Sequence, residues 1–198
     1  PGIWVIALSS AFIYITKYAI SGWGVLFLQK ERAFSLEQAT QIIAFSAVFG
    51  VLGTILAGWL SDKLFKSRAH RTCFFCIIFA TLSFFLFWKT ESITLSFIFL
   101  VLSSFFIYGP QALFGSCASQ QATKFATGTG NGIVGIFGYA SSVVTGVMFG
   151  ARAEAGGWDS VFPIAIAFGI AGAVAIGMMW NAPADGYEKL NKVLKEVE

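Results

Sequence analysis

Residues 3–28 read IWVIALSSAFIYITKYAISGWGVLFL, and this stretch decides the fold. Apart from Lys17 it carries no charged side chain, and no acidic residue lies within ten positions of that lysine. A helix needs about 20 mostly apolar residues to cross the hydrocarbon core of a bilayer. The stretch therefore predicts a membrane-spanning helix with one cation near its middle.

Five further segments are long and apolar enough to cross a membrane in the same way. They cover residues 41–60, 72–88, 93–118, 129–150 and 161–180, and short polar loops separate them. Only 12% of the 198 residues are charged, against about 25% in an average soluble domain. The sequence predicts an all-α integral membrane protein of six transmembrane helices. The net charge of +3 is too small to indicate binding to nucleic acid.

Two parts are expected, a six-helix bundle over residues 1–182 and a polar tail over residues 183–198. The tail is predicted to be helical and to lie in the cytoplasm, or alternatively on the membrane surface. Basic residues are enriched in cytoplasmic loops. One side carries Lys63, Lys66, Arg68, Arg71, Lys124, Lys189, Lys192 and Lys195, and the other carries Lys30, Arg32, Lys89 and Arg152. Both ends of the chain lie on the more basic side and are predicted to be cytoplasmic.

Lys17 gives the strongest functional signal. A lysine near the middle of a span costs about 2.5–3.5 kcal/mol on insertion scales. Roughly 16–20 Å separates it from either surface at 1.5 Å per residue, too far for its side chain to reach water. Such a residue usually has a function, and a structural ion pair is the alternative. Ser10, Tyr14, Ser21 and Gly24 share its helix face, which predicts a water-filled interior, although small residues also serve close helix packing.

The fourth and fifth segments add polar candidates. The motif IYGPQALFG contains Pro110, which lacks a backbone N–H and is predicted to bend the helix. Tyr108 and Gln111 lie on a shared face there. In the glycine-rich fifth segment, Asn131 and Tyr139 favour an edge that faces a pore. The glycines themselves are typical of close helix contact and sliding.

The motif GWLSDKLFKSRAHR closes the second segment on the predicted cytoplasmic side. Gly58 stands four residues before Asp62, and Lys63 and Arg68 follow. Asp62 is expected to accept hydrogen bonds from basic groups or to cap a neighbouring helix, and Gly58 to let another helix come close. A loop that only sets the orientation of the helices in the membrane needs the basic residues. It does not need this spacing of glycine and aspartate.

Catalytic and metal-binding chemistry has little support in the sequence. Cys73 and Cys76 form a Cys-x-x-Cys pair, but a redox or metal site needs further ligands, and Cys117 lies in another segment. Packing is the preferred role of these cysteines, because a free cysteine behaves as a small hydrophobic residue. The single histidine, His70, has no acid–base constellation or nucleophile around it in sequence. No enzyme activity, metal or cofactor is expected.

Three motifs resemble a known family. GWLSDKLFKSR resembles the loop between the eighth and ninth helices of the major facilitator superfamily. IYGPQALFG and ATGTGNGIVGIFGYA are similar to the tenth and eleventh helices of its organophosphate:phosphate antiporter family, and order and spacing agree along essentially the whole chain. The resemblance implies the C-terminal half, helices seven to twelve, of a twelve-helix protein in a bacterial inner membrane, with an N-terminal six-helix half as its partner.

The same resemblance implies a substrate and a site. In the family a cation of helix seven, usually arginine, binds the phosphate group, and three tyrosines of this chain match family positions. The expected substrate-binding set is Lys17, Tyr14, Tyr108 and Tyr139, with Gln111 and Asn131 as weaker candidates. The implied function is exchange of a sugar phosphate or other organophosphate for inorganic phosphate by alternating access. A membrane sensor of sugar phosphate that signals to a partner kinase is the alternative, since the family contains both.

Overall fold

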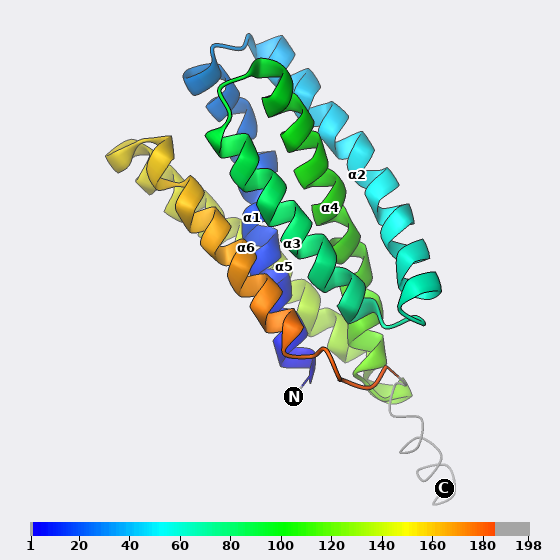
Figure 1. Cartoon of the computed structure of the whole chain (residues 1–198). Coiled ribbons are helices and arrows are strands. Elements are labelled where there is room, and N and C mark those ends of the chain that lie inside the picture. Colours follow the sequence, from blue (N-terminus) through cyan, green and yellow to red (C-terminus); the bar gives the residue numbers. More distant parts are fainter. Residues whose placement is uncertain (1, 185–198) are drawn as a thin grey trace, which may run out of the picture.

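The computed structural model describes residues 2–184, which form six long helices and no strand (Figure 1). The helices are α1 (Gly2–Arg32), α2 (Leu36–Leu64), α3 (Ala69–Lys89), α4 (Ile93–Gln120), α5 (Thr127–Gly156) and α6 (Phe162–Gly177). Short 3₁₀ turns, Lys124–Ala126 and Trp158–Ser160, precede α5 and α6. Each long helix, with α6 taken together with the turn before it, is long and apolar enough to cross a membrane. The predicted six-helix all-α architecture is confirmed.

The helix ends differ from the limits of the apolar segments. α1 continues through polar residues to Arg32, because lysine, glutamine and arginine are good helix formers even where the bilayer ends. α2 begins at Leu36, where Ser35 and Gln38 form a capping box that the apolar pattern does not reveal. α6 ends at Gly177, before the predicted limit at residue 180. The predicted tail lies outside the described residues from 185 onward.

The helices run alternately up and down, so that their connections gather at two ends of the bundle (Figure 1). At the end near the N-terminus, Gln120 donates a hydrogen bond to the Ser67 carbonyl and Gln121 donates one to the Pro183 carbonyl. At the opposite end, Arg32 donates to the Trp88 carbonyl over 3.3 Å. The first end therefore holds the α2–α3 and α4–α5 connections and the segment after α6.

Polar side chains of α1 fix it against α5 and α6. The Ser9 hydroxyl donates to the Gly172 carbonyl over 2.9 Å, and the Thr16 hydroxyl donates to the Ala165 carbonyl over 3.1 Å. Ser10 reaches the Val134 carbonyl of α5 at 3.5 Å. α1 also contacts α2 and α4. It is therefore surrounded by most of the bundle, and a side chain at its middle lies among several helices.

α2 and α4 cross at very short range. A Cβ added to Gly53 would lie 1.9 Å from the backbone oxygen of Phe105, and one added to Gly50 would lie 2.7 Å from the Tyr108 ring. The Thr54 hydroxyl donates to the Tyr108 carbonyl over 3.3 Å. Small residues allow this approach, as in other membrane helix pairs. The contact holds Tyr108 in place beside α1.

Pro110 lies within α4, which runs without interruption from Ile93 to Gln120. Helical residues continue on both sides of it, and the bend expected from proline stays a prediction. Gly109 beside it packs closely against Ala57 of α2. The described structure therefore uses this part of α4 as a packed helix surface.

Candidate functional site

Lys17 stands at the midpoint of α1, fifteen residues from Gly2 and fifteen from Arg32. Its side chain is half-buried. The Nζ atom lies 5.4 Å from the ring centre of Tyr14, 5.7 Å from that of Tyr18 and 5.2 Å from that of Tyr108. Aromatic rings within about 6 Å attract a cation through their electron-rich faces. Three tyrosines, two on α1 and one on α4, thus surround the ammonium group.

Tyr18 belongs to this cluster, although its sequence position did not single it out. The candidates on α1 were chosen because they share a helix face with Lys17. Tyr18 follows Lys17 directly in the chain and does not lie on that face. Tyr18 is nevertheless four residues after Tyr14, and residues four apart are neighbours on a helix. Their ring centres lie 5.9 Å apart. That spacing is the signal that could have found it.

Tyr14 connects the lysine to α5. Its ring meets that of Tyr139 edge-on, with 5.7 Å between the centres. Gly138 makes room for the ring, since a Cβ there would lie 3.2 Å from a Tyr14 ring carbon. The Gln111 Oε1 atom is buried and has no hydrogen-bond partner among the described residues. Gln111 stands on α4, three residues after Tyr108.

A small cavity of about 30 Å³ opens beside Lys17, between α1, α2 and α4. Its polar lining comes from Lys17, Ser21, Ser46, Ser104 and Tyr108. The rest of its wall is apolar and includes Ile20, Ile43 and Ile107. A cavity of this size has room for a water molecule or two beside the ammonium group.

The two ends of the polar face on α1 serve packing. Ser10 is buried against α5, and a Cβ added to Gly24 would lie 2.8 Å from Ile43 of α2. Only the middle of the face, around Lys17 and Ser21, borders the cavity. The expected water-filled face is thus short, and close helix packing explains the rest.

Asn131 does not join the cluster. Its side-chain nitrogen lies 3.4 Å from the Ser119 hydroxyl, and its oxygen would lie 3.5 Å from a Cβ on Gly115. Seven residues separate Asn131 from Gly138, which packs on Tyr14, and this is about 10 Å along a helix. Asn131 is therefore offset from the tyrosines along the axis of α5, and its role in substrate binding stays a prediction.

The loop motif also differs from expectation. Asp62 accepts a hydrogen bond from the Ser67 hydroxyl over 3.0 Å, rather than from a basic group of residues 2–184. Arg68 stands at the start of α3, and no side chain caps that end. Lys63 is exposed. Asp62 therefore fixes the turn that ends α2, where Ser67 has a positive φ of 61°.

Gly58 is not a point of close approach within the described part of the chain. No atom lies within 4 Å of a Cβ built on it. The short contacts of α2 come instead from Gly50 and Gly53, which stand eight and five residues earlier. The Gly58–Asp62 spacing could not indicate Gly50 and Gly53, because the atoms that approach these two glycines belong to another helix, α4.

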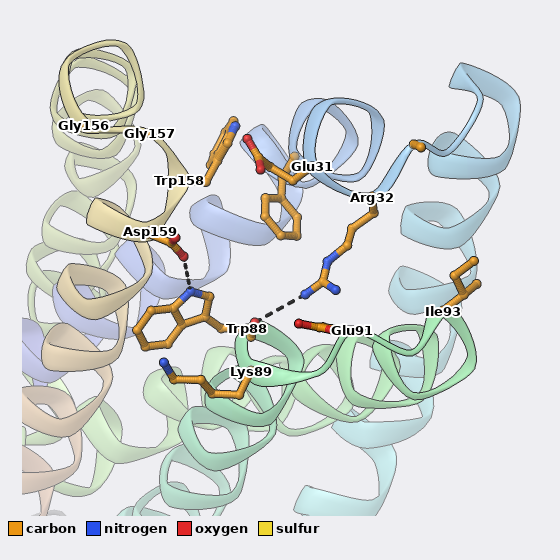
Figure 2. A pocket seen from close by; sticks show the side chains of 12 residues that line it. Glu31, Arg32, Trp88, Lys89, Glu91, Ile93, Gly156, Gly157, Trp158 and Asp159 are labelled. Carbon is orange, nitrogen blue, oxygen red and sulfur yellow. Dashed lines mark hydrogen bonds between the residues drawn. The ribbon is translucent and has the colours of Figure 1, made fainter.

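A larger hollow of about 770 Å³ lies at the end of the bundle away from the N-terminus (Figure 2). The Trp88 indole N–H donates to Asp159 over 3.0 Å, and Arg32 donates to the carbonyl of Trp88 over 3.3 Å. Lys89 Nζ lies 3.7 Å from the centre of the Trp88 ring. Figure 2 shows these residues converging from α1, α3 and the α5–α6 connection. Trp88 thus links three parts of the chain that sequence analysis left unconnected.

Trp88→Phe is expected to lower the unfolding free energy by about 0.5–1.5 kcal/mol, because the indole donor to Asp159 is lost. Thermal unfolding of the purified protein in detergent measures this change. Trp59→Phe is the matched control, since Trp59 is exposed on α2 and its side chain makes no hydrogen bond within residues 2–184. Equal effects of the two substitutions would show that the Trp88–Asp159 hydrogen bond does not contribute to stability.

Cys73 and Cys117 are neighbours in space, with 3.9 Å between their sulfur atoms. They lie on α3 and α4, and both are buried and free, as is Cys76. No group of three or more His, Cys, Asp or Glu side chains within residues 2–184 is arranged to hold a metal ion. The cysteines fill the α3–α4 interface, as their predicted packing role requires.

Several curated proteins are similar to this chain. It is 28% identical over 196 residues to the "Probable hexose phosphate transport protein" of Chlamydia trachomatis, covering 94% of this chain and 42% of that protein. It is 29% identical to the "Glycerol-3-phosphate transporter" of Haemophilus influenzae, covering 85% and 39% of the two chains. It is 30% identical to the "Membrane sensor protein UhpC" of Salmonella typhimurium, covering 95% and 43%. The chain therefore spans about two fifths of the length of these relatives.

A family profile also matches most of the chain. The sequence profile described as Major Facilitator Superfamily matches residues 1–146, which run from α1 into α5. This range includes Lys17, its three tyrosines and the loop that ends α2. The chain belongs to the Major Facilitator Superfamily, whose fold its six membrane-spanning helices share.

Proposed function

We propose that the chain is one half of a transporter that exchanges a sugar phosphate or another organophosphate for inorganic phosphate. Lys17 is the observation that carries this proposal. Every other charged residue in the six helices lies within four residues of a helix end. A lone cation at mid-depth is costly unless a counter-charge reaches it. A phosphate group that enters and leaves supplies that charge without a permanent acidic partner.

The surroundings of Lys17 favour an oxyanion. Its ammonium group offers three N–H donors, and the hydroxyls of Tyr14, Tyr18 and Tyr108 belong to rings whose centres are within 6 Å of it. Gln111, three residues after Tyr108 on α4, is a further candidate through its amide group, which can bond a sugar hydroxyl. Tyr139 extends the set through its contact with Tyr14. These groups together match the phosphate and the hydroxyls of a sugar phosphate.

Exchange follows from the same electrostatics. A bound phosphate neutralises Lys17 and lets the two halves of the protein close over the site. An empty site leaves the ammonium group charged, and closure around it costs desolvation free energy. The site therefore reorients to the other side of the membrane most readily when a second anion is bound. This is the physical reason to propose antiport.

The remaining half of the site would come from a second six-helix bundle. The relatives are about twice as long as this chain, and α2 and α5 carry broad exposed apolar faces that a second bundle can cover. We place this chain as helices seven to twelve, with both of its ends in the cytoplasm of a bacterium and the helices in the inner membrane. Rocking of the halves about Lys17 would give alternating access.

The exchange proposal predicts counterflow. Full-length protein in vesicles loaded with unlabelled phosphate should take up labelled phosphate, and an external organophosphate should compete with it. Uptake should stop in the Lys17→Ala variant, because the anion loses its counter-charge. Vesicles carrying Lys30→Ala are the matched control, since Lys30 is an exposed lysine in the last turn of the same helix.

A sensor is the second candidate, because the chain is also 30% identical to a protein named as a membrane sensor. A sensor would bind sugar phosphate at the same lysine and pass the signal to a partner kinase. Binding of sugar phosphate without any counterflow would therefore favour the sensor and exclude the transporter. Counterflow at rates that depend on Lys17 would exclude a sensor without transport.

A further inference from the structure

A second candidate site lies on the outside of the bundle, between α3 and α6. The two helices touch along the floor of a groove, where a Cβ on Gly169 would lie 2.4 Å from the Thr81 hydroxyl and one on Gly177 would lie 3.0 Å from the Phe74 ring. The groove has a volume of about 570 Å³. Its walls are almost wholly apolar and include Phe74, Ile78, Leu82 and Phe85 of α3 and Ile170 and Val174 of α6.

The groove has the length of one lipid tail within a leaflet. Along α3 it runs from Phe74 to Phe85, eleven residues or about 16 Å. Half of the hydrocarbon thickness of a bilayer is about 15 Å. Leu82 and Ile170 are exposed by half or more, so the groove is open along its side. A hydrocarbon chain that lies parallel to the two helices fits this shape.

One end of the groove carries a positioned arginine. Arg71 stands one turn before Phe74, and its Nε–H donates to the Trp180 carbonyl over 3.0 Å. The guanidinium carbon lies 4.9 Å from the centre of the Trp180 ring, and the Phe74 ring lies 5.6 Å from that ring. The bond and the ring therefore hold the guanidinium at the mouth of the groove. Tryptophan is enriched at this depth, at the boundary between membrane and water.

Arg71 has donors left for a ligand. A guanidinium carries five N–H donors, and within residues 2–184 only the one on Nε is used. No carboxylate among those residues pairs with it, and Asp62 in the preceding loop bonds to Ser67 instead. The basic side chains of Lys66 and Arg68 lie in the same loop. The mouth of the groove is thus positively charged, and a planar guanidinium can bind two phosphate oxygens at once.

We propose that this groove binds an anionic phospholipid, with one acyl chain between α3 and α6 and its phosphate on Arg71. The groove opens on the outer surface of the bundle and has apolar walls, and both features favour a lipid tail over a soluble ligand. The cation at its mouth, which has no acidic partner within residues 2–184, selects a negatively charged headgroup, as basic pockets between membrane helices do. This site lies at the bundle surface, whereas Lys17 lies at mid-depth inside, so its occupation is independent of the proposed transport substrate.

Native mass spectrometry of the full-length protein tests the site with two lipids of equal chain length, phosphatidylglycerol and phosphatidylcholine. The unmodified protein should retain phosphatidylglycerol in preference. Arg71→Gln should lower that occupancy by about tenfold, to the level of phosphatidylcholine, because a charge-assisted hydrogen-bonded pair is lost. Arg71→Lys should keep part of the preference, since lysine retains the charge but not the planar fork.

Filling the groove is the second arm of the experiment. Leu82→Trp should lower retention of both lipids, because the larger side chain occupies the space of the acyl chain. Leu102→Trp is its matched control, since Leu102 is an exposed leucine on α4 that does not line the groove. Excess inorganic phosphate should not displace the lipid, because the tail contributes to binding.

Three outcomes would overturn the proposal. Unchanged phosphatidylglycerol retention in Arg71→Gln would show that the arginine does not select the headgroup. Equal effects of Leu82→Trp and Leu102→Trp would show that the groove does not hold the tail. Displacement by inorganic phosphate would show that the arginine binds free phosphate instead of a lipid. Thermal unfolding in detergent confirms that each variant is folded before its lipids are counted.

Discussion

Lys17→Ala is expected to weaken binding of phosphate and organophosphate by roughly 30- to 4,000-fold. Removal of one partner of a buried, hydrogen-bonded charge pair costs about 2–5 kcal/mol, and each 1.4 kcal/mol is a tenfold change in Kd. The loss is large because no other cation lies at this depth within the described helices. Equilibrium binding of radiolabelled phosphate to the purified full-length protein measures it.

Lys17→Arg should retain part of the affinity, since arginine keeps the charge and can bind phosphate through two N–H groups. Its larger head must fit among Tyr14, Tyr18 and Tyr108, whose ring centres lie within 6 Å of the present Nζ. A partial loss is therefore expected rather than full activity. Equal phosphate affinity in the alanine variant and the unmodified protein would refute the assignment of Lys17.

The stability of the empty protein separates a ligand-binding lysine from a structural one. If Lys17 binds a transient anion, the alanine variant without ligand should be at least as stable as the unmodified protein, because an uncompensated charge has been removed from mid-depth. If Lys17 instead forms a permanent ion pair with a group outside this chain, the variant should be less stable by about 3–5 kcal/mol. Thermal unfolding in detergent, with and without phosphate, distinguishes the two.

Gly53→Ala is expected to destabilise the bundle by about 1–3 kcal/mol or more. The new Cβ would lie 1.9 Å from the backbone oxygen of Phe105. A backbone atom cannot rotate away as a side chain can, so α2 and α4 must separate. Because Tyr108 packs against Gly50 and accepts from Thr54 in the same contact, its position beside Lys17 should shift. Both the melting temperature and phosphate exchange should fall.

Gly58→Ala is the matched control on the same helix. No atom lies within 4 Å of the added Cβ, and alanine favours a helix over glycine by about 0.8–1.0 kcal/mol. The control should therefore be as stable as the unmodified protein or slightly more so. Equal losses in both variants would contradict the assignment of the short contact to Gly53. A loss at Gly58 alone would show that its expected close partner belongs to another part of the protein.

The sequence was a good guide to each helix taken singly. All six spans were predicted from runs of apolar residues, and the structure confirms them. Errors occurred at the ends, as at Ser35, where a local capping box rather than hydropathy sets the start of α2. Local hydrogen bonds decide such boundaries within one turn, whereas a run of apolar residues reports only the thickness of the bilayer.

The site could be predicted only in part. Lys17 was found because it is a charged residue in the middle of an apolar span, and Tyr14 because helical spacing places it on the same face. The same spacing marks Tyr18 as a neighbour of Tyr14. The grouping of Tyr108 and Tyr139 with Lys17 rested on the family resemblance, and the structure places Tyr108 near Lys17 and Tyr139 against Tyr14. Asn131 lies about 10 Å further along α5 than the residue that packs on Tyr14, and its substrate contact stays a prediction.

The sequence alone determined that six helices cross a membrane and that one of them carries a cation at mid-depth. Both are properties of single segments, set by length, hydropathy and the helical repeat. Only the tertiary structure decided which residues meet, such as Cys73 with Cys117 and Gly53 with Phe105. The physical reason is that lipid tails are as apolar as the helix interfaces. Hydropathy therefore fixes neither the rotation of a helix nor its height relative to its neighbours, and close packing of small residues sets both.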